Sequence, residues 1–446
     1  MPLRRILSLD SLLLLVSIFP MLYLRESYVE SERFVLPPQA IWAFADVAYW
    51  LLFAYLLVDF LGRNRDTTRV RLGLLALLIA TIVLAPTVTS VVLRHRSGDP
   101  AQYAHDNPVQ IEAAVDYLRR GVNPYGADYF ATPLARWSGY TGATYSNDPN
   151  AVPPPDWRVN PALYHVVSLP VGLLAAVPFD IVFRAIFGWF DARALYLAAY
   201  LLSLWLIGRV VADPTRRLAA LIAVGLNPLL VSFLVEGRND ILVFSLVLAS
   251  AVAWQKRRLD LSGVLLGLAI MTKHIAILFL PFYALLGWQV SFPLRKRVLQ
   301  LGRHLLPVFW AALLVAVPFL IWNWRAFYDD TFGYLAGSTA HAYPLSGMGF
   351  GGLVVTWGWV PNAGVPFPSL LYQLAFGLPL LAALLWVQWR QNSIRVALAA
   401  YAIFLLVYMW FARFFFDNYL GYIIMLLAVA YFWPSEESPV GEAEAA

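Results

Sequence analysis

Long apolar runs, separated by short polar turns, follow one another along the chain. Most of these runs have about 17 to 25 residues, the length that an α-helix needs to cross a bilayer. Ten uninterrupted runs are found near residues 8–24, 40–61, 72–93, 191–211, 217–235, 239–255, 305–323, 368–389, 396–411 and 418–433. This pattern predicts an all-α polytopic membrane protein.

Two further apolar stretches are longer and contain breaks. The stretch 164–190 is interrupted at Pro170 and Pro178, and the stretch 261–288 is interrupted by the polar triplet 272–274. Backbone breaks at membrane depth persist only where the chain is buried in protein or lines a cavity. We therefore expect each stretch to form a short hairpin or re-entrant pair, which gives about 12 to 14 membrane crossings in total.

The composition supports this interpretation and excludes an ordinary cytosolic enzyme. Of the 446 residues, 60% are hydrophobic and 13% are charged, whereas soluble domains have about 25% charged residues. The absence of cysteine excludes disulfides, iron–sulfur centres and zinc–thiolate sites. The first apolar run ends at Arg25 and Glu26 without a small-residue cleavage site, so we expect it to be retained as a helix.

Basic residues predict which helix ends face the cytoplasm. They gather in short turns that fall on one side of the membrane when both broken stretches return to their starting face. These residues are Arg4, Arg5, Arg63, Arg65, Arg69, Arg71, Arg209, Arg216, Arg217, Lys256, Arg257, Arg258, Arg295, Lys296, Arg297, Arg303, Arg390 and Arg395. The other loops then lie on the extracytoplasmic face of the plasma membrane.

The expected organisation alternates groups of helices with two long outer loops. Its parts are N-terminal helices 1–94, an outer catalytic loop 95–163, central helices 164–324, a second outer loop 325–367, C-terminal helices 368–433 and an acidic cytoplasmic tail 434–446. Polar and ionisable residues that end helices at one common face usually mark a functional site. We therefore expect the site at the outer face, where short turns also carry charged residues.

The first outer loop contains a helix signal. Asn107 is suited to the N-cap, Pro108 to the first helical position and Gly121 to the stop, which predicts an amphipathic helix over 108–120. Such a helix would lie on the membrane surface or pack on the bundle. It would place Asp106 at its positive end, where an ionised carboxylate is favoured.

Aromatic residues are frequent in the same loop. Sugars bind well where aromatic rings stand beside carboxylates and amides, because sugar C–H faces pack on rings and hydroxyls need hydrogen bonds. An aromatic belt at the membrane surface explains part of this pattern equally well. The aromatic residues are Tyr125, Tyr129, Trp137, Tyr140, Tyr145, Trp157 and Tyr164.

Short motifs in the chain resemble those of class C glycosyltransferases, the GT-C superfamily of polytopic enzymes that use polyprenyl-phosphate-linked sugars. His105-Asp106, followed by Gln110, Glu112 and the segment 121–125, resembles the first outer loop of that superfamily. This resemblance implies a GT-C-type helix bundle with its site at the outer face.

Two later motifs extend the resemblance. Gly237-Arg238-Asn239-Asp240 looks like the Gly-His-Asn-Asp motif of polyprenyl-phosphomannose-dependent mannosyltransferases, with Arg238 in place of the usual histidine. The segment 263–273, followed by Pro281, is similar to the helix-Lys-helix-Pro pattern that comes next in those enzymes. The resemblance thus implies a polyprenyl-phosphate sugar donor and a lipid- or glycan-linked acceptor.

The implied reaction is an inverting transfer of a monosaccharide, with mannose as the first candidate and an outer-loop aspartate as general base. Such a transfer needs a base for the acceptor hydroxyl and cations for the leaving phosphate. Asp106 is the first candidate for the base and Asp99 the second; a stabilising position at a helix N-terminus is the alternative role of Asp106. Membrane lipids are expected partners, and nucleic acid is not.

The candidate phosphate-binding cations on the outer face are Arg238, Lys273, His274, His341 and Arg413. Lys273 stands out because a lone lysine between apolar runs is costly unless it meets an anion. A structural pair with Asp240 or Glu236 is an equally good interpretation of it. The candidate substrate-binding residues are His105, Gln110, Glu112, Asn123, Tyr125, Asn160, Tyr164, Asn239 and Asp240.

No cofactor is expected. Outer-face aspartates could bind a divalent cation, but no Asp-x-Asp pair occurs in the first loop, and we favour a metal-independent mechanism. A transporter or lipid flippase is the main alternative function, with Asp46 and Asp59 as its in-span carboxylates. A non-catalytic scaffold is a third possibility and would not need Asp106.

Overall fold

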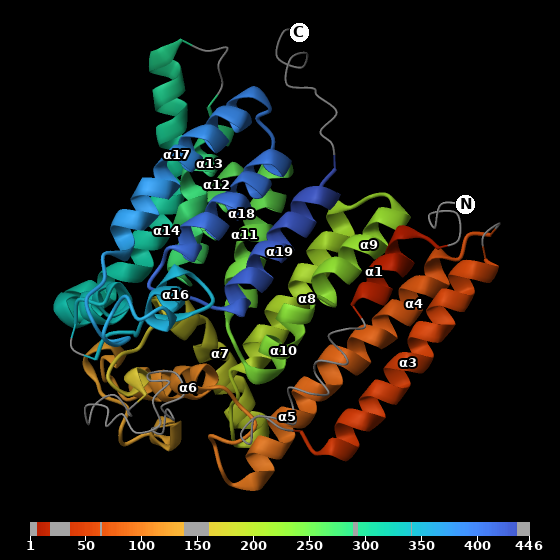
Figure 1. The fold of residues 1–446 in the computed structure, drawn as a ribbon, viewed down its shortest axis with the longest axis horizontal. Helices are drawn as coiled ribbons and strands as arrows, with labels where there is room; N and C mark the ends of the chain where they lie inside the picture. The colour runs from red at the N-terminus through yellow and green to blue at the C-terminus, as the bar shows by residue number, and fades with distance from the viewer. Residues whose placement is uncertain are drawn as a thin grey trace.

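The computed structural model describes residues 7–17, 36–62, 65–137, 160–288, 293–339 and 341–434 (Figure 1). Nearly all regular structure in these ranges is helical, so the prediction of an all-α polytopic membrane protein is confirmed. Some predictions lie outside the described residues: Arg4, Arg5 and Arg63, the first apolar run beyond residue 17, Tyr140, Tyr145, Trp157 and the tail from residue 435.

Among the described residues, six helical segments are long and apolar enough to cross a bilayer. They are α3 (Pro38–Leu61), the segment Thr68–Ser97 built from α4 (Thr68–Ile79), η2 (Ala80–Leu84) and α5 (Ala85–Ser97), α7 (Pro170–Phe187), α8 (Arg193–Val210), the segment Leu294–Ala336 and α17 (Ser369–Arg390). Five shorter apolar helices are α11 (Asp240–Gln255), α12 (Leu259–Ile270), the segment His274–Leu286, α18 (Ile394–Trp410) and α19 (Asp417–Phe432). The number of 12 to 14 crossings stays a prediction.

One predicted break does not occur. α7 begins at Pro170 and continues through Pro178 as a single helix, so the predicted hairpin in 164–190 is wrong. Pro170 occupies the start of the helix, where the missing N–H has no intrahelical acceptor to lose. Pro178 is tolerated inside because proline can be accommodated in membrane helices whose surroundings satisfy the freed carbonyl.

A different proline divides a run that the pattern predicts as one helix. The run 217–235 consists of α9 (Pro214–Gly225) and α10 (Pro228–Glu236), which meet at an angle of 48°. Pro228 lacks an N–H and disfavours helical backbone at the residue before it. Asn227 adds a side-chain cap, because its Oδ1 accepts a hydrogen bond from the Leu229 amide at 3.0 Å.

The other predicted break is present. α12 ends at Ile270, Lys273 has an extended backbone, and the chain resumes with the 3₁₀-helix η8 (His274–Phe279) and α13 (Leu280–Leu286). The polar triplet therefore forms the turn between two short helices. This turn places Lys273 at the same end of the bundle as Asp240, the first residue of α11.

The second outer loop is more structured than predicted. α14 (Leu294–Tyr328) bends at Asn323 and passes without a loop into η9 (Asp329–Gly333) and α15 (Tyr334–Ala336). The start of the outer segment at residue 325 stays a prediction, and the bend at Asn323 lies close to it. Beyond α15, the two-residue strand β1 (Ser346–Gly347) pairs in parallel with β2 (Phe414–Phe415), and α16 (Phe350–Thr356) follows.

The remaining elements flank this bundle. They are α1 (Leu9–Val16), α6 (Asp106–Arg119) and the 3₁₀ turns η3 (Pro124–Gly126), η4 (Pro133–Trp137) and η7 (Pro161–Leu163). α6 lies across the lower end of the helices in Figure 1 and packs against α7, while α1, α3 and α4 stand together at the right. α6 turns the side formed by Val109, Ala113 and Ala114 inward.

Burial separates a central helix from lipid-facing ones. α11 is apolar and buried on nearly all sides, as expected for a helix at the centre of a bundle. α17 exposes large apolar side chains, among them Leu371 at 67% and Trp386 at 61% exposure. Lipid is the solvent that suits such a surface.

Candidate active site

Asp106 is the first residue of α6 and meets two predicted site residues. His105 Nδ1 lies 2.6 Å from Asp106 Oδ1, and Asn160 donates a hydrogen bond from Nδ2 to Asp106 Oδ2 at 3.0 Å. His105 Nδ1 is also 3.2 Å from the Asn107 amide nitrogen. One nitrogen cannot donate to the carboxylate and accept from the amide at once, so we assign its proton to the shorter contact.

The Asp106 carboxylate is held in its ionised form. Burial acts to raise its pKa, but the charge and hydrogen bond of His105, the hydrogen bond from Asn160 and the charge of Arg238 outweigh burial and lower the pKa to about 2. The start of α6 adds a favourable dipole. Asp106 is therefore available as a proton acceptor at neutral pH.

α6 begins two residues earlier than the predicted start at 108. A proline is tolerated throughout the first helical turn, because the first four amides have no intrahelical partner. Pro108 therefore identifies the first turn without defining the residue at which the helix begins. The backbone amide of His105 donates to the Glu236 carbonyl at 2.8 Å and ties this start to the end of α10.

The turn between α10 and α11 carries the predicted arginine. Arg238 lies 3.4 Å from Glu236, 3.8 Å from Asp417 and 3.4 Å from Asn418 Oδ1, and its guanidinium stands over the Phe233 ring. Its Nε is buried and has no hydrogen-bond partner among the described residues. Arg238 is thus surrounded by long, loose contacts and can still bind an anion.

Asp240 and Lys273 form a close pair next to Arg238. Lys273 Nζ lies 2.5 Å from Asp240 Oδ1, and Asn418 donates a hydrogen bond from Nδ2 to Asp240 Oδ2 at 2.8 Å. Lys273 also stands over the Tyr419 ring at 4.6 Å. The structural pair that the sequence left as one alternative for Lys273 is therefore present.

Glycine makes the close approach of these elements possible. Gly237 ends α10 with a φ of 98°, and a Cβ built there would lie 2.7 Å from Pro108 and 3.1 Å from Arg193. Only a residue without a side chain fits both the left-handed backbone and the space. The α6 start and the α10–α11 turn are consequently in direct contact.

Aromatic side chains from segments that are far apart in the sequence pack together. The ring of Tyr164 stacks on His341 at 3.7 Å with an interplanar angle of 2°, and Phe130 packs edge-on against Tyr164. His341 has a φ of 55°, which is uncommon for a residue with a side chain. The structure thus brings together two predicted site residues that are far apart in sequence.

His165 and Asp330 form a pair that the sequence analysis does not predict. His165 Nδ1 is 2.7 Å from Asp330 Oδ1, and the Val166 amide donates to Asp330 Oδ2 at 3.1 Å. The pair connects the segment that follows the first outer loop to η9. Asp330 lies in the predicted second outer loop, but His165 lies in the segment assigned to the central helices, so the sequence carries no common signal for the pair.

Several predicted substrate-binding residues have their polar atoms engaged within the protein. Gln110 donates to the carbonyls of Ala162 and His165, and the Tyr125 hydroxyl donates to the Ser168 carbonyl. Both side chains are nearly inaccessible, and they connect α6 and η3 to the returning chain. Their contacts support the fold of the loop.

Glu112 belongs to a buried ion network. It pairs with Arg94 at 2.7 Å, and Arg94 also contacts Asp191 at 2.8 Å. Arg193 pairs with the same Asp191 carboxylate at 2.8 Å. Arg193 in addition donates to the carbonyls of Tyr103 and Val235. This network fixes α6 against α5 and α8, and it gives Glu112 a structural partner that sequence reasoning did not identify.

The second base candidate has a different environment. Asp99 is half-buried and pairs with the more exposed Arg136 at 3.1 Å. Among the described residues it has no ion pair with the cations around Asp106. The structure therefore favours Asp106 over Asp99 as the base.

The remaining candidates lie apart from this cluster or show few contacts. Arg413 is buried, donates to the carbonyls of Tyr343, Val365 and Ala363, and has its pKa lowered to about 10 by burial. His274 packs edge-on against Phe332. Two amides complete the candidates: Asn123 caps η3 through the Tyr125 amide, and Asn239 precedes α11 without a side-chain cap.

Asn418 and Tyr419 contact the Arg238, Asp240 and Lys273 side chains, and the sequence analysis does not select either of them. Asn418 bridges Arg238 and Asp240, and Tyr419 lies under Lys273. Their signal was weak, because a short polar break before an apolar helix is common. Among the residues that the structure describes, no group of three His, Cys, Asp or Glu residues is arranged to hold a metal ion.

The carboxylates proposed for a transporter give that alternative little support. Asp59 lies near the end of α3 and pairs with Arg71 at 3.1 Å. Arg71 also contacts Asp10 at 2.9 Å, so this cluster joins α1, α3 and α4 at a helix end. Asp46 is exposed on α3. The Asp59 carboxylate is therefore part of an ion cluster between helices.

Comparison with known proteins identifies the family. The family model of glycosyltransferase family 87 matches residues 160–413, a segment that includes Asn160, Arg238, Asp240 and Lys273. No curated protein and no solved structure matches the chain. The matched segment covers more than half of the sequence and ends at Arg413. This multi-pass membrane protein therefore belongs to glycosyltransferase family 87.

Proposed function

We propose that the protein transfers a monosaccharide, with mannose as the first candidate, from a polyprenyl-phosphate donor to a hydroxyl of a lipid- or glycan-linked acceptor. The reaction takes place at the extracytoplasmic face of the plasma membrane and inverts the anomeric centre. The observation that carries this proposal is the ionised Asp106 carboxylate beside Arg238, with the Asp240–Lys273 pair next to them. One site then holds both a base and phosphate-binding cations.

The chemical step uses Asp106 as general base. Its carboxylate takes the proton of the acceptor hydroxyl while that oxygen attacks the anomeric carbon of the donor sugar. The bond from the anomeric carbon to the phosphate oxygen breaks, and polyprenyl phosphate leaves with the bonding electrons. Asn160 and His105 hold the carboxylate in place during the reaction.

Arg238 is the first candidate for holding the donor phosphate. Its buried Nε has no hydrogen bond among the described residues, and its ion pairs with Glu236 and Asp417 are longer than 3.3 Å. A guanidinium can exchange such contacts for a bidentate bond to phosphate oxygens. Lys273 adds a point charge but stays paired with Asp240 in the free protein.

Donor binding would also activate the base. The charge of Arg238 is one of the factors that lower the pKa of Asp106. A phosphate bound to Arg238 compensates that charge, which raises the pKa of Asp106 and makes it a stronger proton acceptor. This coupling favours an order in which the donor binds before proton transfer.

The proposal is tested by replacing each base candidate in turn. Purified protein in proteoliposomes is incubated with a panel of labelled polyprenyl-phosphate sugars and a lipid acceptor extract. Asp106→Asn should lower the transfer rate by about 10²- to 10⁴-fold, because a general base contributes that much. Asp99→Asn is the matched control, since Asp99 is a loop carboxylate that pairs with Arg136, and it should keep the wild-type rate.

Full transfer by Asp106→Asn would refute the catalytic assignment. Transfer from a nucleotide sugar in place of every polyprenyl-phosphate sugar would refute the donor assignment. The same assay with EDTA tests metal independence: an unchanged rate is expected, and loss of activity that Mg²⁺ or Mn²⁺ restores would contradict it.

A further inference from the structure

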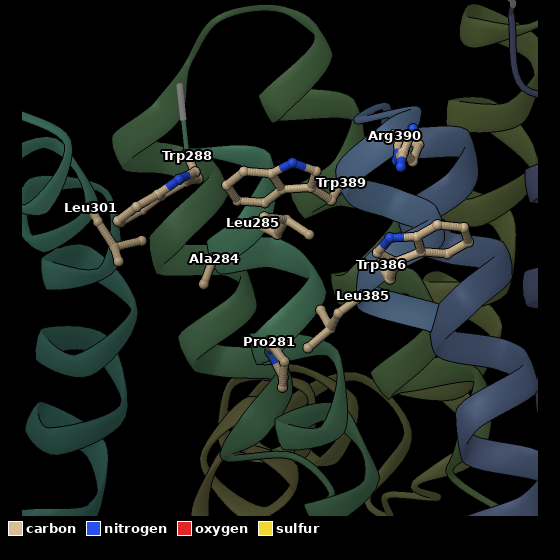
Figure 2. A pocket seen from close by; sticks show the side chains of 9 residues that line it. All are labelled: Pro281, Ala284, Leu285, Trp288, Leu301, Leu385, Trp386, Trp389 and Arg390. Atoms are coloured by element: carbon tan, nitrogen blue, oxygen red, sulfur yellow. The ribbon is translucent and has the colours of Figure 1, made fainter. Parts of the chain in front are cut away.

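A cavity of about 690 Å³ lies between α13, α14 and α17, away from Asp106 and its partners. Its size falls within the range of about 300 to 1,000 Å³ that is usual for small-molecule sites. Figure 2 shows Trp288, Trp389 and Arg390 toward one end of the cavity and Leu385 and Pro281 toward the other. The cavity is therefore amphipathic along its length.

The end with Arg390 and Trp288 lies where α13 and α17 end and α14 begins. The surrounding sequence is strongly basic: segments 281–303 and 385–396 contain six basic residues and no acidic residue. Arg390 is exposed and stands over the Trp386 ring at 5.0 Å, and it has no ion pair among the described residues. An anion at this end of the cavity would therefore meet a cation that no carboxylate of the described residues neutralises.

One hydrogen-bond donor at this end of the cavity also lacks a partner. The Trp288 Nε1 atom is buried and has no hydrogen-bond partner among the residues that the structure describes. Buried indole N–H groups normally find an acceptor. An ester carbonyl or phosphate oxygen in the cavity would provide one, while Leu285 and Leu385 would contact the attached hydrocarbon.

We propose that this cavity binds an anionic glycerophospholipid from the leaflet on the side of the basic turns. Arg390 holds the phosphate, Trp288 donates to a lipid oxygen, and the acyl chains occupy the apolar end and continue along α17. Trp386 and Trp389 suit this position, because indole rings prefer the boundary between headgroups and hydrocarbon. The site is separate from the proposed transfer site and does not depend on its chemistry.

Native mass spectrometry of the purified full chain tests the proposal. The probes are dioleoyl phosphatidylglycerol, dioleoyl phosphatidylcholine and a polyprenyl phosphate. Wild-type protein should retain one phosphatidylglycerol more tightly than phosphatidylcholine. Arg390→Gln should raise the dissociation constant for phosphatidylglycerol about fivefold, the effect expected for one basic residue near a charged headgroup.

A matched control comes from the other arginine–tryptophan pair. Arg209 stands over Trp205 at 5.4 Å near the end of α8 and does not line the cavity, so Arg209→Gln should leave retention unchanged. Ala284→Trp should fill the cavity and abolish retention of the lipid. If Ala284→Trp fails to fold, Arg390→Gln still tests the proposal.

Three results would overturn the proposal. One is equal retention of the two phospholipids, and another is equal loss in Arg390→Gln and Arg209→Gln. The third is a stronger effect of Arg390→Gln on polyprenyl phosphate than on phosphatidylglycerol. Asp106→Asn should retain phosphatidylglycerol as the wild type does, so failure of the transfer proposal would leave this one intact.

Discussion

Asp106 shows how neighbours set the behaviour of a single residue. Burial alone would favour the neutral acid, but His105, Asn160 and Arg238 together favour the carboxylate. A folded-state pKa of about 2 lies below the ordinary value of 3.8. Ionisation of Asp106 therefore contributes stability that is present above about pH 4 and is lost as the pH falls toward 2.

This sign gives a prediction for pH dependence. The difference in unfolding free energy between wild type and Asp106→Asn should be constant from pH 5 to about pH 4. It should then change by about 2 kcal/mol as the pH falls toward 2. Thermal unfolding in detergent across this range measures the difference. A difference that stays constant between pH 4 and pH 2 would contradict the assigned environment.

Lys273 has two possible roles: its close pair with Asp240 can stabilise the fold, or its charge can bind the donor phosphate. Removing one partner leaves the other charge uncompensated, so Lys273→Met should lower the unfolding free energy by about 3 kcal/mol. The double variant Asp240→Asn/Lys273→Met should be more stable than Lys273→Met. Additive losses in thermal unfolding would show that the pair is not coupled.

Donor kinetics separate the two roles of Lys273. If Lys273 also binds phosphate, the double variant should recover stability while its KM for the donor stays raised and its KM for the acceptor is unchanged. Recovery of both stability and donor KM would make the pair purely structural. Asn418, which donates to Asp240 in either case, is left unchanged in these variants.

At the scale of elements, the site depends on how α6 is held at the end of the bundle. Arg94 binds its residue Glu112 and is itself held by Asp191, and Gly237 allows α10 to approach Pro108. Helix propensity does not specify these contacts. They nevertheless decide where Asp106 lies relative to the α10–α11 turn.

Gly237→Ala tests this packing. The substitution should cost about 1 to 2 kcal/mol through left-handed backbone, and the new Cβ should also displace Pro108 and lower the transfer rate. Gly188→Ala is the matched control, because Gly188 ends α7 with a φ of 78° and has nothing within 4 Å of its Cβ position. Similar activity losses in both variants would contradict a specific contact at Gly237.

At the scale of the whole molecule, charge is divided between the two ends of the bundle. Arg65, Lys256 and Arg390 lie at turns or helix ends on one side, whereas the Asp106 cluster lies with α6 at the other. The positive-inside rule then predicts the membrane orientation. The wild-type chain has no cysteine, so single cysteines can be placed without a background.

Cysteine labelling tests this orientation. In intact cells, a membrane-impermeant thiol reagent should label Val122→Cys, which is exposed beyond α6. It should label Arg65→Cys and Lys256→Cys, which are exposed at the opposite turns, only after permeabilisation. Labelling of Val122→Cys and Arg65→Cys from the same side would refute the topology.

The class of protein and most of its helices follow from local features of the amino-acid sequence. Apolar length and missing charge leave only a bilayer as solvent, and runs such as 40–61 and 368–389 coincide with α3 and α17 within a few residues. The break near Lys273 could also be predicted, because a polar triplet inside an apolar stretch is costly without a turn.

Tertiary structure decided what local pattern cannot specify. Pro178 continues a helix while Pro228 begins one after the capping residue Asn227, and the two prolines do not differ in a way that local pattern reveals. Gln110 and Glu112 have the right chemistry for a sugar site but face internal partners. Asn418 reaches Asp240 across 178 positions, a contact that only the packing of α19 against α11 creates. Hydrophobic length is encoded locally, whereas the partner of each polar atom depends on how the whole chain packs.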